Sequence, residues 1–150
     1  MRIKAKPEDF RVEELLDVSP GKSGSYVVFR VQKRDLATLE VQTRLAAKLG
    51  LPPAAVQFPA LKDKVAVAVQ YCTVKVGKSQ VPKEVQGAGF SATFLGFLPR
   101  PLTPKDLLGN KFTVVLRDIA KEEAERIRTR FHLLGCEGFP NYFDLQRFGS

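Results

Sequence analysis

The stretch Tyr26-Val27-Val28-Phe29-Arg30-Val31 decides the fold class, because the hydrophobic period changes directly after it. Its β-branched and aromatic residues are typical of a buried strand. Beyond it, apolar residues recur at the spacing of one helix face, namely Val41, Leu45 and Leu49. Thr38 is the predicted N-cap of this helix, and Gly50 is predicted to end it.

Further strands are predicted on both sides of this strand and helix. Alternating or β-branched residues indicate strands around 10–13, 65–76, 90–98 and 112–119. A second amphipathic helix fits 121–134, with Gly135 behind it. The predicted strands come in adjacent pairs separated by single helices. This favours an α+β fold, with a mixed, largely antiparallel sheet and helices on one face.

Length and composition fit one compact domain. The chain has 150 residues, and its 44% hydrophobic content is enough for a core without disulfide staples. Its two cysteines, Cys72 and Cys136, lie far apart, and His132 is the single histidine, so we expect no metal site. The sequence shows no apolar run of membrane-spanning length and no secretory signal, so we expect a cytoplasmic protein.

The net charge of +8 predicts a polyanionic partner, of which nucleic acid is the commonest. The alternative is that this charge serves solubility only. No basic tail is present, so an anion-binding surface would belong to the folded part of the chain.

Lys62-Asp63-Lys64 is the strongest candidate for chemistry. Two adjacent cations keep a carboxylate ionised, and a partly dehydrated carboxylate is a competent nucleophile. The same lysines would also attract a phosphate backbone. The alternative is an exposed turn with ordinary surface charges.

Two further segments are candidates for binding. The stretch 138–150 combines aromatic side chains that could stack on unpaired RNA bases with polar side chains that could contact base edges or phosphates; the polar members are Asn141, Gln146 and Arg147. The alternative is that the aromatics belong to a core. Gly109-Asn110-Lys111-Phe112 stands at the start of a predicted strand, where glycine and asparagine also commonly form a turn.

Taken together, these segments resemble the TruD family of tRNA pseudouridine synthases over essentially the whole chain. The matching motifs, in family order, are Pro7-Glu8-Asp9-Phe10-Arg11-Val12-Glu13-Glu14, then Lys62-Asp63-Lys64 with Ala66-Val67 and Gln70, then Gly109-Asn110-Lys111-Phe112, and finally Pro140-Asn141-Tyr142-Phe143 with Gln146-Arg147-Phe148-Gly149. The sequence departs from the family pattern at Tyr26, Ala60, Ala68 and Asp144.

The resemblance implies an isomerase that converts a uridine of tRNA, position 13 by family analogy, into pseudouridine. Asp63 would be the nucleophile, and no cofactor or metal would be needed. Phe10 and Phe112 would contact the flipped base, Asn110 would hydrogen-bond near the nucleophile, and Lys62 would hold a phosphate or the carboxylate. The remaining expected RNA-binding residues are Lys64, Asn141, Gln146 and Arg147.

Members of this family continue well past the last motif. The resemblance therefore implies that 1–150 is the N-terminal portion of the catalytic domain, without the inserted domain and the C-terminal return segment. We expect such a chain to be inactive alone, and either to bind a complementary chain or to self-associate. The alternative functions are a catalytically silent RNA-binding module that keeps the fold, and a structural domain with a basic surface.

Overall fold

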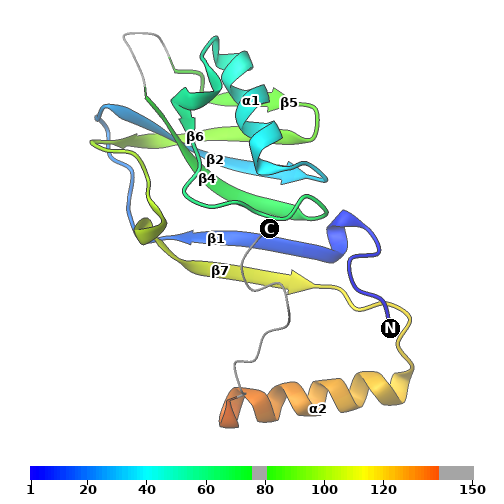
Figure 1. The fold of residues 1–150 in the computed structure, drawn as a ribbon. Coiled ribbons are helices and arrows are strands. Elements are labelled where there is room, and N and C mark those ends of the chain that lie inside the picture. The colour runs from blue at the N-terminus through cyan, green and yellow to red at the C-terminus, as the bar shows by residue number, and fades with distance from the viewer. Residues whose placement is uncertain (76–80, 139–150) are drawn as a thin grey trace. The chain divides into compact units, whose positions relative to one another are not determined.

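The computed structural model describes residues 1–75 and 81–138. They fall into two compact units, which are described separately: the main unit, Arg2–Leu116, and a second unit that contains Met1 and the described residues from Arg117 onward. Figure 1 labels the helices and strands. None of the described helices is long and apolar enough to cross a membrane.

The main unit is built on one mixed sheet. Its strands are β1 (Phe10–Leu16), β2 (Tyr26–Arg34), β3 (Val56–Gln57), β4 (Val67–Lys75), β5 (Glu84–Gly87), β6 (Phe90–Leu98) and β7 (Leu107–Val114). Within the described residues the strand order is β5-β6-β2-β4-β1-β7, and β3 pairs with β4 beside this path. Only β1 and β4 pair in parallel; the other neighbours are antiparallel. The predicted α+β fold with a mixed, largely antiparallel sheet is confirmed.

Helix α1 (Thr38–Leu49) covers one face of the sheet (Figure 1). The predicted apolar face of the helix is buried there, with Val41 and Leu45 inaccessible to solvent. It packs against alternate residues of β2, namely Val27, Phe29 and Val31. Each such side chain contributes about 1.5–3 kcal/mol when fully buried. As predicted, Gly50 ends the helix, and its φ of 68° lies in the left-handed region that glycine tolerates best.

Among the described residues, three short 3₁₀ helices connect these elements, and each begins with a proline. They are η1 (Pro7–Asp9), η2 (Pro53–Ala55) and η3 (Pro104–Asp106). Proline suits a first helical position, because its missing N–H would have no partner there.

Strand β7 differs from its prediction. The sequence predicts a strand at 112–119, but β7 spans Leu107–Val114. Gly109 and Asn110, which resemble a turn, pair instead with Leu15 and Glu14 of β1. The pairing slips by one residue at Leu108, and Gly109 has a φ of 156° beside this bulge. A positive φ of this size suits glycine, which has no Cβ, so the glycine marks an irregularity within the strand rather than its start.

The second unit contains helix α2 (Lys121–Glu137). The helix predicted for 121–134 is therefore present, but it continues through Gly135. Gly138, with a φ of 76°, caps it instead.

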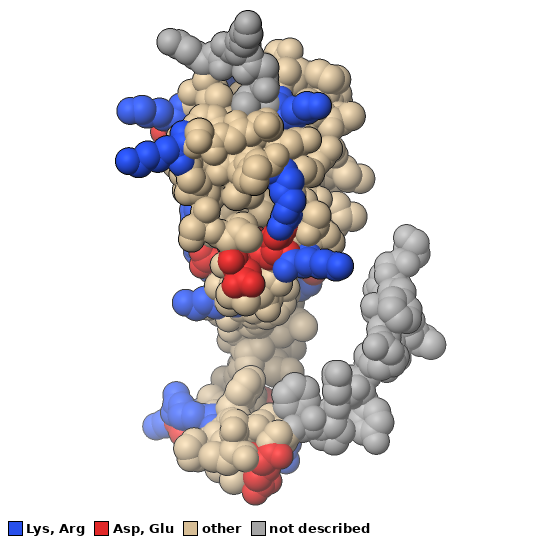
Figure 2. All heavy atoms as spheres, turned by 90° about the vertical axis from the view of Figure 1, so that its left-hand side faces the viewer, with Lys and Arg blue, Asp and Glu red and all other residues tan. Residues whose placement is uncertain are grey.

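Basic charge is spread over the face of the main unit that Figure 2 shows. On the face that Figure 2 shows, Lys and Arg side chains project at separate points, and acidic side chains lie near some of them. This face therefore carries no single continuous basic patch, and a polyanion would bind at particular groups of basic residues.

Candidate active site

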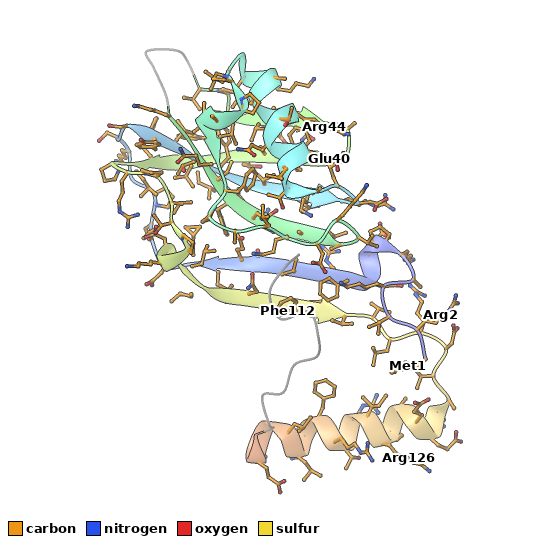
Figure 3. The ribbon with its side chains drawn as sticks, viewed as in Figure 1. Met1, Arg2, Glu40, Arg44, Phe112 and Arg126 are labelled. Atoms are coloured by element: carbon orange, nitrogen blue, oxygen red, sulfur yellow. The ribbon has the colours of Figure 1, made fainter. Side chains whose placement is uncertain are left out.

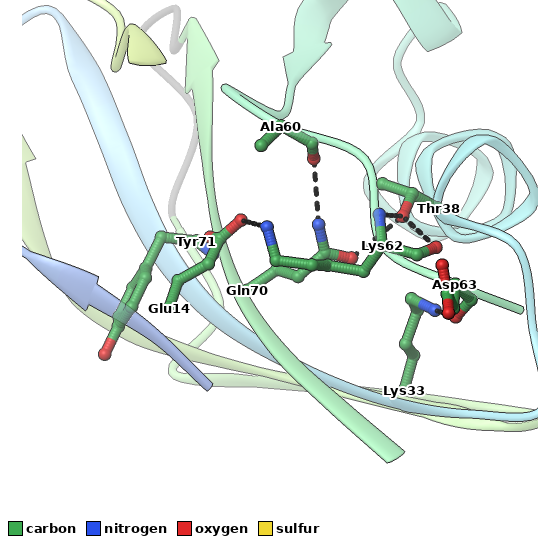
Figure 4. Close-up of polar contacts among 8 residues, drawn as sticks. All are labelled: Glu14, Lys33, Thr38, Ala60, Lys62, Asp63, Gln70 and Tyr71. Atoms are coloured by element: carbon green, nitrogen blue, oxygen red, sulfur yellow. Dashed lines mark hydrogen bonds and ion pairs between the residues drawn. The ribbon is translucent and has the colours of Figure 1, made fainter. Parts of the chain in front are cut away.

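Asp63 lies in the loop that joins β3 to β4, on the side of the sheet that α1 covers (Figure 4). Its side chain is 59% exposed, so the carboxylate is open to a ligand. The loop is nevertheless held at its backbone and at its side chains. The structure therefore differs from the alternative of a simple surface turn.

Two lysines from distant parts of the chain reach Asp63. The Nζ of Lys4 lies 2.5 Å from Oδ2 of the Asp63 carboxylate. The Nζ of Lys33, on β2, donates a hydrogen bond of 2.6 Å to the backbone carbonyl of Asp63. Sequence reasoning assigned the supporting cations to the neighbours Lys62 and Lys64. It missed Lys4 and Lys33, because folding rather than chain proximity brings them to the site.

Lys62 turns away from Asp63 and binds Glu14. Its Nζ lies 2.7 Å from the Glu14 carboxylate, and the two side chains are only 11% and 0% exposed. The second oxygen of Glu14 accepts a hydrogen bond from the backbone N–H of Tyr71 on β4. Glu14 thus ties β1 to β4 and to the loop (Figure 4). Glu14 can be recognised in the sequence, because it is a carboxylate at a position of β1 where the alternation of buried and exposed residues would place an apolar side chain.

Thr38 and Gln70 hold the backbone just before Asp63. The Thr38 hydroxyl accepts a hydrogen bond from the N–H of Lys62 at 3.1 Å and donates its one proton to Oε1 of Gln70 at 2.9 Å. The Gln70 amide in turn donates to the carbonyl of Ala60 at 2.9 Å. Both side chains are buried, at 3% and 1% exposure. Figure 4 shows this network beneath the loop.

This network also corrects the predicted N-cap. Ala37, not Thr38, occupies the N-cap position of α1, and the Glu40 side chain accepts a hydrogen bond from the Ala37 N–H. Thr38 is the first helical residue, and its hydroxyl is used by the loop. A local pattern identifies a helix start to within a residue, but it does not show which partner a hydroxyl takes.

An aromatic pair lies beside the carboxylate. The rings of Phe10 and Phe112 are 5.8 Å apart, and the Nζ of Lys4 lies 4.0 Å from the centroid of the Phe10 ring. Phe112 projects from β7 (Figure 3) and is 57% exposed. Because Phe112 pairs with Val12 and Asn110 pairs with Glu14, strand alternation puts all of them on the face that carries Asp63.

The structure thus brings together Asp63, Phe10 and Phe112, with Asn110 on the same face. Lys64 is exposed beside Asp63. The other predicted site residues, Asn141, Gln146 and Arg147, lie outside the described residues. The part of the chain that the structure describes contains no group of three or more His, Cys, Asp or Glu side chains that could hold a metal ion.

The charged groups of the site differ in burial, since Lys33 is buried and the Asp63 side chain is exposed. Burial lowers the pKa of Lys33 from 10.5 to about 8; nearby Asp63 opposes this shift, and Lys62 adds to it. The carboxylate of Asp63 thus combines solvent access with a contact to the Lys4 ammonium, while Lys33 holds the backbone carbonyl of the same residue. This arrangement suits a nucleophile or an anchor for a cationic group.

Comparison with known proteins identifies relatives over the whole chain. A family model described as tRNA pseudouridine synthase D (TruD) matches residues 1–150. A tRNA pseudouridine synthase D from Aquifex aeolicus is 35% identical; the match covers 100% of this chain and 40% of that protein. Another from Leptospira interrogans is 33% identical over 97% of this chain and 36% of its own length.

A solved structure shows the same fold. A crystal structure from Methanosarcina mazei, described as that of a candidate tRNA pseudouridine synthase D, superposes with a TM-score of 0.85 and 26% identity. It matches 99% of this chain and 35% of that one. The chain therefore spans well under half the length of these relatives.

We predict that the Lys62–Glu14 pair is essential to stability. Lys62→Met leaves a fully buried carboxylate without its cation, which should lower the free energy of unfolding by about 3–5 kcal/mol. Adding Glu14→Gln should recover part of this loss, because the buried charge is then removed. Urea denaturation of the two single variants and the double variant measures the coupling.

The matched control is Arg44→Met, which breaks the exposed Arg44–Glu40 pair on α1 (Figure 3) and an exposed hydrogen bond from Arg44 to the Ala88 carbonyl. This change should cost less than about 1 kcal/mol. Equal losses in Lys62→Met and Arg44→Met would contradict a structural role for the buried pair.

We predict a pH dependence of stability that originates from Lys33. Its pKa is lower in the folded chain than the ordinary 10.5, so the unfolded chain binds more protons between pH about 8 and 10.5. The free energy of unfolding should therefore rise with pH across this window, relative to a variant without this lysine. The measurement compares the wild type with Lys33→Met and with Lys48→Met, an exposed control. Equal slopes in all three proteins would disprove the prediction.

Proposed function

Because this chain belongs to the TruD family of tRNA pseudouridine synthases, we propose that it supplies the nucleophile of an isomerase that converts a uridine of tRNA into pseudouridine. The observation that carries the proposal is the exposed Asp63 carboxylate, held by Lys4 on a loop with an anchored backbone. We propose further that residues 1–150 form the N-terminal portion of the catalytic domain, with the inserted domain and the return segment outside this chain.

The proposed reaction needs no oxidant, metal or cofactor. The Asp63 carboxylate attacks the ribose C1′, and the C1′–N1 bond breaks with its electron pair on the base. The detached uracil then rotates, its C5 attacks C1′, and the bond from C1′ to the carboxylate breaks. Loss of the proton on C5 and gain of one at N1 complete an isomerisation in which atoms and electrons balance. This chemistry uses a carboxylate as the nucleophile, which is the role proposed for Asp63.

The target base must first leave the RNA stack, at a cost of a few kcal/mol. Phe10 and Phe112 support this step, because their ring pair offers an apolar wall next to Asp63. We assign Asn110 to hydrogen bonding near the base and Lys64 to the phosphate backbone. The contact with Glu14 favours a positioning role for Lys62 over the phosphate contact expected from its sequence.

tRNA is the proposed substrate, and the cytoplasm is the proposed location. The net charge of +8 supports a polyanionic partner. Asn141, Gln146 and Arg147 remain proposed RNA-binding residues on the strength of their motif alone, as does position 13 for the target uridine.

We propose that another polypeptide segment covers strand β7. This strand is last in the order of the sheet among the described strands, and it exposes Leu108 and Val114 at 66% and 44%. Unpaired strand edges with apolar side chains readily pair with further strands. A complementary chain or a second copy of this chain would fulfil this role.

This proposal predicts self-association of the 150-residue chain at micromolar concentration. Leu108→Lys should reduce the associated fraction, because a lysine on an edge strand opposes pairing. Leu39→Lys, at an exposed position of α1 away from this edge, is the control. Light scattering measures the mass. A monodisperse wild-type monomer would exclude a second copy, and a complementary chain would then be sought by co-purification.

Asp63→Asn tests the proposed chemistry. In the complete gene product that carries this chain, the variant should form no measurable pseudouridine and should bind unmodified tRNA at least as well as the wild type. A lost nucleophile removes transition-state stabilisation rather than ground-state binding. Asp17→Asn, at the opposite end of β1, is the control and should retain activity.

Two outcomes would change the assignment. Pseudouridine formation by Asp63→Asn at the wild-type rate would exclude Asp63 as nucleophile. If the wild type binds tRNA but forms no pseudouridine, the alternative of a catalytically silent RNA-binding module applies.

A further inference from the structure

A groove lies on the face of the sheet opposite Asp63. Side chains alternate between the two faces along a strand, so Val12 shares a face with Asp63, and its neighbours Arg11 and Glu13 lie on the other. On that face, β1, β2, β4 and β7 line a groove of about 160 Å³, which we call the far-face groove. The polar side chains that line it are Arg11, Glu13, Arg30, Gln32, Lys111 and Thr113.

The floor of the far-face groove is apolar. It is formed by Val67 and Val69 of β4, which are only 6% and 7% exposed. Strand β4 lies between β2 and β1, and Arg30 of β2 reaches across it to the carboxylate of Glu13 on β1, at 3.3 Å. Cations held over a dehydrated apolar surface attract an anion more strongly than cations surrounded by water.

Cations outnumber anions in this groove. Arg11, Arg30 and Lys111 face one carboxylate, that of Glu13, and this carboxylate is engaged by Arg30. Within the part of the chain that the structure describes, neither Arg11 nor Lys111 has an ion-pair partner. Both side chains are exposed, so they are free to bind an anion from solution.

The size and the donors of the far-face groove suit a phosphate group. Its volume corresponds to about five water molecules at roughly 30 Å³ each, which accommodates a group with four oxygens. The guanidinium groups match pairs of phosphate oxygens, and the Gln32 amide and the Thr113 hydroxyl add neutral donors. A strand added at the edge of β7 would extend the sheet in its plane and leave this groove open.

We propose that the far-face groove binds a backbone phosphodiester of RNA, away from the nucleotide that reacts. This inference rests on the proposed function, since it takes RNA as the ligand. The groove and Asp63 lie on opposite faces of the sheet, so one nucleotide cannot reach both. The phosphodiester therefore belongs to another segment of the folded RNA. The groove contributes affinity and orientation, and it takes no part in the bond changes at C1′.

The salt dependence of RNA affinity tests this inference without requiring activity. The proteins are the complete gene product as wild type, Arg11→Gln and Lys111→Gln, and the probe is unmodified tRNA. Each variant should weaken binding about three- to tenfold and reduce the slope of log affinity against log salt by about 1, because one phosphate contact is lost. KM for tRNA should rise by the same factor, and kcat should change less than about twofold.

Matched variants separate this site from general charge. Lys22→Gln removes an exposed lysine from the turn that joins β1 to β2, at the other end of these strands, and should leave the salt slope unchanged. Lys111→Arg keeps the cation and should bind tRNA like the wild type. A thermal melt of each variant shows whether it is folded.

Footprinting of lysines identifies the occupant. Bound tRNA should protect Lys111, and not Lys22, from acylation as measured by mass spectrometry. Protection of Lys111 by inorganic phosphate but not by tRNA would assign the groove to a small phosphorylated ligand and overturn the inference. A carbodiimide cross-link from Lys111 to a carboxylate of the protein outside the groove would also overturn it, because an acidic polypeptide would then be the occupant.

Failure of this inference is distinguishable from failure of the proposed function. Unchanged affinity and salt slope in Arg11→Gln and Lys111→Gln, with normal pseudouridine formation, would refute the inference alone. Weakened binding in both variants, with no pseudouridine formed by the wild type, would refute the proposed function and leave the RNA site standing.

Discussion

The buried carboxylate of Glu14 is the interaction on which the rest of the site depends. It accepts a hydrogen bond from Lys62 on one oxygen and from the N–H of Tyr71 on the other. These contacts join β1, β4 and the loop that carries Asp63. A buried charge is tolerated only when it is paired and hydrogen-bonded, so none of these parts can shift without a large cost. The parallel pairing of β1 with β4 is therefore linked to the position of the nucleophile loop.

The three lysines around Asp63 have different partners and differ in how deeply they are buried. Lys62 neutralises Glu14, Lys33 holds the backbone of Asp63, and Lys4 contacts the carboxylate. The contacts beneath the loop are buried, and the one above it is open to solvent. A rigid support beneath an exposed carboxylate suits a nucleophile, because the support fixes the position of the carboxylate while solvent and substrate can still reach it. Thr38 completes this support beneath the loop, because its hydroxyl accepts one hydrogen bond and donates another.

Strand β7 adds the aromatic wall through an irregularity. The bulge at Leu108 and Gly109 sets the register in which Asn110 faces Glu14 and Phe112 faces Val12. Because side chains alternate along a strand, a slip of one residue would turn Phe112 to the other face of the sheet. The positive φ of Gly109 beside this bulge gives the glycine of the motif a structural reason, and the residues that follow it, Asn110 and Phe112, lie on the face of the sheet that carries Asp63.

The sequence by itself determined the fold class, α1, the longer strands other than β7, Gly50 as the helix end and the candidate nucleophile, because hydrophobic period and motif spacing are local properties. Only the tertiary structure decided which groups surround Asp63. Lys4 and Lys33 reach it from 59 and 30 residues away, and Lys62 leaves it for Glu14, 48 residues distant. Such pairs depend on strand register and on which face of the sheet a side chain occupies. A period of two residues marks two faces but does not say which of them will be buried or what will lie above it.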